Sequence, residues 1–276
     1  MIVENKAGST ADTTRASAGN NLVSEDERRL VDYLREKNLD RTNAISAQVN
    51  PENTIYTRYI KRLLDILIAF PIFVITLPIN LVLGICTYFD VGRPIFYKQT
   101  RCGKDGKMFT MIKFRNMTNE TDKDGKLLPA KERVTKFGRI MRKYSLDELL
   151  NFWNVLKGDM SIIGPRPLPA FFSDRMSDRH KMRYVVRPGL ECPRIIEMDE
   201  SVCPYHHQFE NDIWYVENVG LKTDVFLIVH LVKMTLFSSK IRKRNADGAS
   251  YFVGYDEEGQ ALSLTRAKRM YGNAEE

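Results

Sequence analysis

Two neighbouring acids, Asp147 and Glu148, are the residues of this chain whose types and spacing best fit chemistry on phosphate. They stand in the stretch KYSLDELLNFWNVLKGDMSIIGPRPLP, residues 143–169. A pair of carboxylates can hold one Mg²⁺ with the oxygen ligands which that ion prefers. An ionised carboxylate can also attack phosphorus and form an acyl phosphate, which divides one displacement into two steps. A plain helix cap would explain the same pair, so the surrounding residues must decide.

The helix expected to carry these acids is defined by its end signals. Ser145 and Glu148 have the spacing of a capping box and Gly158 is a stop signal, so we expect a helix over residues 146–157. Unpaired N–H groups and the dipole at its start would keep Asp147 ionised. Five apolar residues make its expected buried stripe. They are Leu146, Leu149, Leu150, Trp153 and Leu156.

Cations recur along the sequence on both sides of the acid pair. Lys113 and Arg115 stand two apart in an expected strand, where alternate side chains share a face. Arg166 lies between two prolines that restrict the backbone, and Arg187 precedes a Pro-Gly turn. We expect all four to bind phosphate oxygens. A solvated strand edge is the plainer explanation of the first two.

The elements around these groups can be assigned from pattern. Residues 94–117, PIFYKQTRCGKDGKMFTMIKFRNM, predict two strands joined by a charged, Gly-rich turn. A basic helix follows, with Val134, Phe137 and Met141 on its apolar side. Its cations could rest on anionic lipid head groups. They are Arg133, Lys136, Arg139, Arg142 and Lys143.

The largest single feature is an uncharged run over residues 66–89, ILIAFPIFVITLPINLVLGICTYF. A helix of about 20 residues crosses a hydrocarbon core of roughly 30 Å. Pro71 and Pro78 predict a kink, and Asn80 could satisfy a carbonyl that proline frees. Basic residues on both flanks would place both ends in the cytoplasm, which favours a re-entrant hairpin over residues 63–89. A spanning anchor with a proline kink is the alternative.

The two ends of the chain are expected to lie outside the catalytic region. Residues 1–57 predict a flexible extension with a short helix that begins with a capping box at Ser24. The core is expected over residues 58–237, and its last part, residues 221–237, predicts a helix that lies in the membrane interface or packs on the core. Residues 238–276 predict two short extended pieces that pack on or near the active site.

Composition limits the class of partner. The chain has 276 residues with 42 Lys and Arg against 35 Asp and Glu, so its net charge is +7 and anionic partners are favoured. Nucleic acid is disfavoured because no recognised motif for it occurs. The four cysteines have no metal-ligand spacing, which favours a reducing compartment. The first residues lack the apolar core of a secretory signal, so the amino end should stay in the cytoplasm.

These motifs, in their order, resemble the monotopic polyprenol-phosphate phosphoglycosyl transferases of bacteria, the small membrane-anchored type of the bacterial sugar transferase family. The resemblance extends over about residues 59–272. It is carried by KRLLD at 61–65, the proline-broken run, KFRNM at 113–117, KFGRIMRKYSLDELLNFWNVLKGDMSIIGPRP at 136–167, RPGL at 187–190 and WYVEN at 214–218. After RPGL the chain departs from the family pattern, because Glu191 and Cys192 replace small residues.

The resemblance implies an α+β fold: a compact catalytic region, a re-entrant helix-break-helix with Pro78 at the break, and interfacial amphipathic helices. It implies transfer of a phospho-sugar from a UDP-sugar to undecaprenyl phosphate with release of UMP, the first membrane step of glycoconjugate or exopolysaccharide synthesis. Asp147 would be the nucleophile of a ping-pong mechanism, with Glu148 as its partner, and both would hold Mg²⁺. Lys113, Arg115, Arg166 and Arg187 would bind phosphate.

The implied location is the cytoplasmic face of the bacterial inner membrane, where the protein would be monotopic and in contact with membrane lipids. A homodimer is a family-level expectation. A different class of function stays open at this point. The same basic, anchored chain could be a non-catalytic binding protein for anionic lipid.

Overall fold

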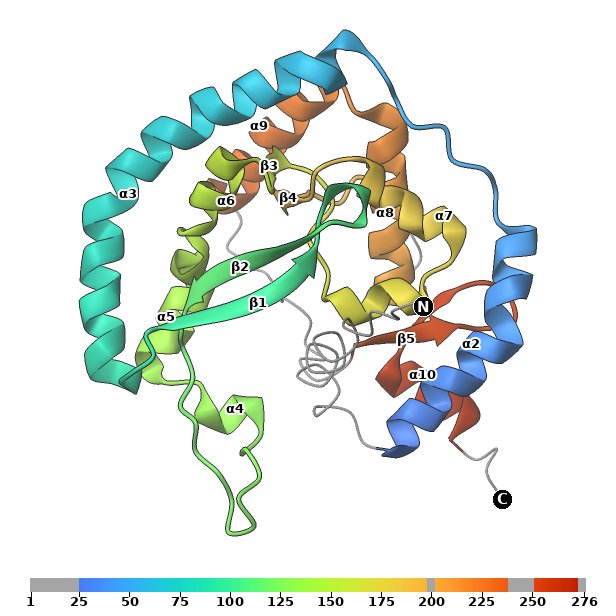
Figure 1. The fold of residues 1–276 in the computed structure, drawn as a ribbon, viewed down its shortest axis with the longest axis horizontal. Helices are drawn as coiled ribbons and strands as arrows, with labels where there is room; N and C mark the ends of the chain where they lie inside the picture. Colours follow the sequence, from blue (N-terminus) through green and yellow to red (C-terminus); the bar gives the residue numbers. More distant parts are fainter. Residues whose placement is uncertain (1–24, 198–201, 238–250, 273–276) are drawn as a thin grey trace, which may run out of the picture.

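The computed structural model describes residues 25–197, 202–237 and 251–272. Over these residues the chain forms helices and three small two-stranded sheets. One long helix curves around the outside of the other elements (Figure 1). The mixed helix and sheet class is therefore confirmed, whereas the re-entrant hairpin and the interfacial helices stay predictions.

The long helix, α3 (Lys61–Val91), follows a π-helical turn, η1 (Tyr56–Ile60). Its helical structure continues through Pro71 and Pro78, both of which have exposed side chains. Proline removes a backbone donor and bends a helix, and Figure 1 shows α3 as an arc. The structure thus shows a curved helix where a helix-break-helix was expected at Pro78.

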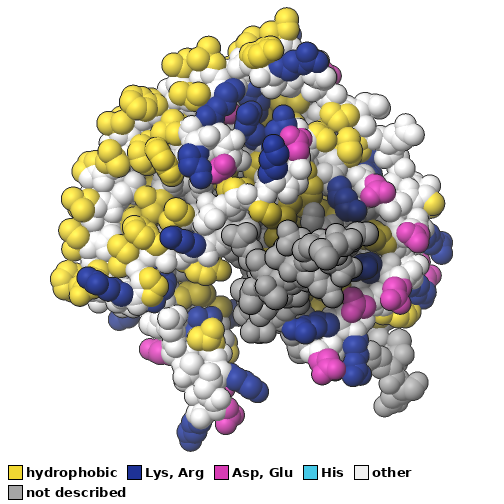
Figure 2. Space-filling model, in the orientation of Figure 1, with side chains coloured by type: hydrophobic (Ala, Val, Ile, Leu, Met, Phe, Trp, Pro, Cys, Tyr) yellow, Lys and Arg dark blue, Asp and Glu magenta, His cyan; other side chains and the backbone are white. Residues whose placement is uncertain are grey.

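The outer side of α3 is apolar and exposed. Within the described residues, one helical segment, Tyr56–Val91, is long and apolar enough to cross a membrane. Only 22% of its most apolar stretch of 18 residues is buried. Leu67, Ile75 and Leu81 are among its exposed side chains. Figure 2 shows hydrophobic side chains along the rim that α3 forms. This surface is what a membrane contact requires.

Two polar residues of α3, Thr76 and Asn80, are buried. Thr76 donates a hydrogen bond from its hydroxyl to the Phe73 carbonyl at 3.1 Å. Asn80 is 8% exposed, and neither its side-chain nitrogen nor its side-chain oxygen has a hydrogen-bond partner within the described residues. The role expected for Asn80, to satisfy a carbonyl freed by proline, is therefore wrong.

A β-hairpin lies inside the arc of α3 (Figure 1). Strands β1 (Phe96–Cys102) and β2 (Met108–Phe114) pair antiparallel, and the turn η2 (Lys104–Gly106) joins them. Phe96 stands opposite Phe114 in this register. The two strands predicted here are confirmed, and the second ends one residue before Arg115.

Two helices lead from the hairpin to the acid pair. They are α4 (Ala130–Arg133) and α5 (Lys136–Tyr144), and the Thr135 hydroxyl caps α5 by accepting a bond from the Gly138 amide. Met141 is fully buried and Phe137 is partly buried, which confirms part of the expected apolar side, but Val134 has an extended backbone between the two helices.

The acid pair lies in a 3₁₀ turn, η3 (Leu146–Glu148), which precedes α6 (Asn151–Lys157). The predicted capping box is wrong. Ser145 adopts left-handed backbone geometry with φ 55°, ends α5, and makes no side-chain cap to η3. The predicted stop at Gly158 is confirmed, with φ 98°. Glycine suits this left-handed position because it has no Cβ.

The buried stripe predicted for this segment is only partly right. Leu146, Leu149 and Leu150 pack against a buried cluster, but the Trp153 side chain is 49% exposed. Val155 is fully buried instead. A 3₁₀ turn has three residues per turn rather than 3.6, so the faces of the following helix rotate relative to the expected pattern.

A parallel pair of short strands holds the loop that contains Arg166. These are β3 (Ser161–Ile163) and β4 (Gly189–Glu191). A Cβ added at Gly189 would lie 2.1 Å from the Gly164 backbone nitrogen, so the crossing needs glycine. Three short helices connect the strands. They are η4 (Ala170–Arg175), α7 (Asp178–Lys181) and η5 (Met182–Val185).

The start of α3 is fixed to helices α8 (Pro204–Asn218) and α9 (Leu221–Phe237). The Asp224 carboxylate on α9 accepts a bond from Lys61 Nζ at 2.7 Å and from the Tyr215 hydroxyl at 2.7 Å. The Tyr56 hydroxyl donates to the same carboxylate. The predicted helix over residues 221–237 is confirmed.

The two ends of the chain fold together. The N-terminal helix α2 (Glu25–Ile45) has 21 residues and is longer than expected. It packs Val31 and Leu34 on the C-terminal elements. These are β5 (Phe252–Tyr255), β6 (Ala261–Ser263) and α10 (Leu264–Tyr271). The two extended pieces are confirmed; Ser24 and the expected flexible tail lie outside the described residues. The placement of this end on or near the active site stays a prediction.

Candidate active site

The carboxylate of Asp147 is buried and held by an amide. Its side chain lies in η3, and the residue is 5% exposed. Asn116, two residues beyond β2, donates from Nδ2 to Asp147 Oδ2 at 3.0 Å. Asn116 Oδ1 accepts bonds from Arg142 Nη2 at 2.8 Å and Nε at 3.1 Å. The guanidinium thereby fixes the amide, and the amide fixes the orientation of the acid.

Glu148 collects two cations from distant segments. Lys113 Nζ and Arg166 Nη2 each lie 2.9 Å from Glu148 Oε1. Arg166 Nη1 is also 3.9 Å from a carboxylate oxygen of Glu191. The side chains of Lys113 and Arg166 are 18% and 30% exposed, so incoming ligand atoms can reach both. Charge-assisted bonds of this kind can be exchanged for bonds to phosphate oxygens.

Burial and neighbouring charges shift the pKa values of these cations in different directions. Burial lowers the pKa of the Lys113 ammonium, against the opposing effect of Glu148. Burial also acts to lower the pKa of Arg166, but the Glu148 and Glu191 carboxylates outweigh it and raise the pKa. A bound anion would favour the charged form of each side chain, and only Lys113 has a lowered pKa for it to raise again.

The Pro-Arg-Pro loop is fixed from behind by two further arginines. Arg183 Nη2 donates to the Arg166 carbonyl at 2.6 Å and lies 2.8 Å from Asp212 Oδ2. Arg101 Nη1 donates to the Pro167 carbonyl at 3.1 Å. Burial raises the pKa of Asp212 to about 6, despite the nearby Arg183. These contacts hold the backbone from which the Arg166 side chain extends.

The other two predicted phosphate ligands lie elsewhere. Arg115 donates to the Gly92 carbonyl at 3.1 Å and also to the Val91 carbonyl, so it caps the end of α3. Arg187 Nε donates to the Gly158 carbonyl at 3.0 Å, at the end of α6. Lys113 and Arg115 were expected to share one face of a strand. Strand β2 ends at Phe114, so the alternation of side chains does not extend to Arg115. Their binding of phosphate stays a prediction.

Several residues of this site could not be predicted from the sequence. Asn116 lies inside the KFRNM motif and Arg142 on the basic helix, but neither pattern predicts their contacts at Asp147. The same holds for Arg101, Arg183 and Asp212 behind the Pro-Arg-Pro loop. Each makes its contact through residues far away in the sequence, so no local period or spacing could reveal the contact. The local signal in the sequence is the pair of polar residues, Arg115 and Asn116, directly after strand β2.

Binding of Mg²⁺ by Asp147 and Glu148 stays a prediction. No group of three or more His, Cys, Asp or Glu residues suited to a metal occurs in the described ranges. Mg²⁺ commonly binds through one or two carboxylates together with substrate phosphates and water. The adjacent acids Asp147 and Glu148 are such an incomplete set. They would hold the ion only with oxygen atoms from a bound diphosphate.

A buried acid, a second acid paired with two cations and a long apolar helix are features expected of proteins that act on phosphate groups at a membrane. The model of the family described as bacterial sugar transferase matches residues 56–238. The chain belongs to the bacterial sugar transferase family, and the polyprenol-phosphate phosphoglycosyl transferase class predicted from its motifs is confirmed.

Three relatives show the range of similarity. The uncharacterized sugar transferase EpsL of Bacillus subtilis is 38% identical over 195 residues, which cover 71% of this chain and 96% of that protein. The UDP-N-acetylgalactosamine-undecaprenyl-phosphate N-acetylgalactosaminephosphotransferase of Aeromonas hydrophila is 32% identical, with 64% of this chain and 44% of that protein covered. The undecaprenyl-phosphate galactose phosphotransferase of Salmonella typhimurium is 32% identical, with 65% and 41% covered. The chain spans less than half the length of the last two.

Proposed function

We propose that this protein transfers a phospho-sugar from a UDP-sugar to undecaprenyl phosphate, as the first membrane step in the synthesis of a polysaccharide or glycoconjugate. The observation that carries this proposal is the buried, amide-held carboxylate of Asp147 beside a Glu148 that binds Lys113 and Arg166. The printed names of the Aeromonas and Salmonella relatives support the choice of substrates.

In the first half-reaction, a carboxylate oxygen of Asp147 attacks the phosphorus that carries the sugar. The bond from this phosphorus to the bridging oxygen breaks, UMP leaves with that oxygen, and the phospho-sugar remains on Asp147 as an acyl phosphate. Asn116 keeps the attacking group in place, because Arg142 restrains its amide. Lys113 and Arg166 stabilise the charge on the diphosphate oxygens.

In the second half-reaction, a phosphate oxygen of undecaprenyl phosphate attacks the same phosphorus. The bond to Asp147 breaks, its carboxylate is restored, and undecaprenyl-diphospho-sugar is released. Because one residue carries the phospho-sugar between two substrates, the kinetics should be ping-pong. A Mg²⁺ ion held by Asp147 and Glu148 would neutralise phosphate charge when bound.

The proposed setting is the cytoplasmic face of the bacterial inner membrane, with α3 entering one leaflet and returning. The exposed apolar side of α3 and its polar attachment through Lys61 support a membrane contact. Cysteine labelling at the N-terminal helix and at α10, from each side of the membrane, tests the topology. Both labels should react from the cytoplasm, and labels on opposite sides would contradict the monotopic arrangement.

The activity test is release of UMP from a panel of UDP-sugars by the purified protein in lipid nanodiscs with undecaprenyl phosphate. We expect the wild type to release UMP with at least one sugar and Asp147→Asn to release none. If wild type and variant are both inactive across the full panel, the proposed enzyme is wrong and a binding protein for anionic lipid becomes the better account.

A further inference from the structure

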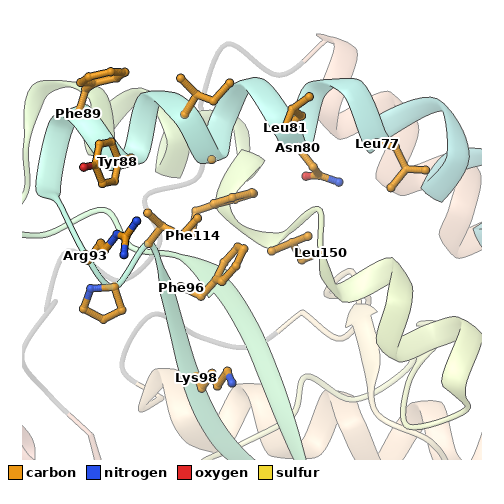
Figure 3. A pocket seen from close by; sticks show the side chains of 14 residues that line it. Leu77, Asn80, Leu81, Tyr88, Phe89, Arg93, Phe96, Lys98, Phe114 and Leu150 are labelled. Carbon is orange, nitrogen blue, oxygen red and sulfur yellow. The ribbon is translucent and has the colours of Figure 1, made fainter.

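A large groove lies between α3 and the hairpin β1–β2. Its volume is about 1450 Å³, whereas pockets for compact ligands usually measure about 300–1,000 Å³. Leu81 and Tyr88 line it from α3, and Phe96, Phe114 and Leu150 line it from the opposite side (Figure 3). An apolar space of this size suits a long hydrocarbon chain better than a sugar nucleotide.

One buried polar side chain points into this groove without a partner. Asn80 extends from α3 into the space opposite Leu150 (Figure 3). The residue is 8% exposed, and both polar atoms of its side chain lack a hydrogen-bond partner within the described part of the chain. A buried amide without partners is costly, and such groups are rare in folded proteins. A polar atom of a bound ligand would satisfy it.

The charge of the groove favours an anion. Arg93 and Lys98 are its charged lining residues, and its lining contains no acid. Arg93 lies over the Tyr88 ring, with the guanidinium carbon 5.8 Å from the ring centre. Arg93 lies at the Tyr88 end of the groove and Asn80 at the other end (Figure 3), so the two cations make the lining positive as a whole and the buried amide is the group that marks one end for a polar atom.

Two lining residues of the groove are close in sequence to residues of the acid site. Leu150 follows Glu148 by two residues, and Phe114 precedes Asn116 by two residues. Two residues of extended chain span about 7 Å, and two residues of 3₁₀ helix rise about 4 Å. Leu150 and Phe114 in the wall of the groove are therefore joined to the site around Asp147 by short segments of chain.

We propose that this groove holds the hydrocarbon chain of the acceptor lipid, with its phosphate at the Asn80 end. The inference rests on the proposed function, because it assigns a site to the acceptor of that reaction. The amide of Asn80 donates to a phosphate oxygen, and the chain lies along α3 toward Tyr88. The exposed apolar side of α3 places the groove beside the lipid from which the acceptor enters.

The test fills the groove and measures each half-reaction separately. Gly84 lines the groove, and a Cβ there would make ordinary contacts at 3.7 Å with Phe114 and 3.8 Å with Ile95. Gly84→Phe should raise the KM for undecaprenyl phosphate at least tenfold. It should leave the stoichiometric release of UMP in the absence of acceptor as in the wild type. Val82→Phe adds an aromatic ring on the exposed side of α3 and is the matched control.

A second variant adds little bulk and tests the amide. Asn80→Leu has almost the same size, and we expect it to raise the KM for undecaprenyl phosphate about tenfold, since it removes one bond to a charged group. Normal acceptor kinetics in Gly84→Phe and Asn80→Leu, with UMP release intact, would overturn the groove assignment. Absence of UMP release from the wild type would instead contradict the proposed function.

A competition experiment separates the acceptor from ordinary membrane lipid. A polyprenyl phosphate with a photoreactive chain should label residues of the groove, and undecaprenyl phosphate should suppress the labelling. Phosphatidylglycerol vesicles at equal concentration should not. Equal suppression by both lipids would overturn the proposal and make the groove a general phospholipid contact.

Discussion

Two clusters in this molecule place a carboxylate against a lysine at almost the same distance. Asp224 lies 2.7 Å from Lys61, with side chains only 7% and 11% exposed. Glu148 lies 2.9 Å from Lys113, whose side chain is 18% exposed, and its second cation, Arg166, is 30% exposed. The first cluster is closed by tyrosine hydroxyls, whereas the second remains accessible.

This difference separates a structural role from a chemical one. The hydroxyls of Tyr56 and Tyr215 add to the lysine at Asp224, and the cluster joins α3 to α8 and α9. At Glu148 the ion pairs are with the cations Lys113 and Arg166, which can turn to the phosphate oxygens of a substrate. The KRLLD and WYVEN motifs therefore contribute to attachment of α3, and under the proposed function the cations at Glu148 bind the substrate.

The largest effect should come from Asp147→Asn. Removal of the nucleophile should lower kcat by at least about 10³-fold, because the acyl phosphate cannot form. The thermal midpoint should stay close to that of the wild type, since Asn keeps the shape of the side chain. UMP release and a thermal melt of the same sample measure both. If Asp147→Asn kept its activity, the region around Glu148 would have no chemical role to distinguish it from the structural cluster at Asp224.

The opposite pattern is expected for Asp224→Ala. Loss of one partner from a buried pair leaves Lys61 uncompensated and should cost about 3–5 kcal/mol of stability. The activity of the molecules that remain folded should be close to normal. The double variant Lys61→Met with Asp224→Leu should recover much of the thermal midpoint, because it removes both charges. A loss of activity in the recovered double variant would argue against a purely structural role.

A smaller effect on catalysis is expected for Arg166→Lys. Lysine keeps the charge but loses the planar pair of donors, so we expect kcat/KM for the UDP-sugar to fall about 10- to 100-fold. Stability should change little, since the side chain is 30% exposed. Steady-state UMP kinetics at varied UDP-sugar give the result. An unchanged kcat/KM would place the diphosphate away from Arg166.

Elements with a clear local pattern could be predicted from the sequence, while long-range contacts could not. The hairpin around residues 103–107, the apolar side of α5 and the stop at Gly158 all follow from nearby residues. Ser145 has the correct spacing for a capping box, but it serves as the left-handed end of α5, and packing of that helix decides the outcome. Asn116 is important only because Asp147 and Arg142 are folded against it.

Arg115 shows the same limit and gives a fourth test. It was grouped with Lys113 by strand alternation, yet its guanidinium meets the carbonyls at the end of α3. Arg115→Gln should therefore cost about 1–2 kcal/mol of stability through loss of this cap. Steady-state kinetics of the same variant test the predicted binding of phosphate. A large increase in the KM for the UDP-sugar would support that role, and an unchanged KM would contradict it.

The smallest effect concerns Asp212, the buried acid behind the Pro-Arg-Pro loop. Burial raises its pKa from 3.8 to about 6, so the folded state binds the extra proton between these two pH values. Stability contributed by this group is therefore lost as the pH rises from about 4 to 6. The side chain of Asp212→Asn cannot ionise. Its thermal midpoint should therefore rise relative to that of the wild type as the pH increases over that range. A difference that does not vary with pH would contradict the raised pKa.

The most direct measurement of the central claim is a search for the phospho-sugar on the protein. The wild type is incubated with its UDP-sugar without undecaprenyl phosphate, quenched, digested and examined by mass spectrometry. The account predicts about one phospho-sugar per molecule on the peptide that contains Asp147, and none on the Asp147→Asn protein. UMP release that occurs only when undecaprenyl phosphate is present, with no adduct on Asp147, would contradict a covalent intermediate.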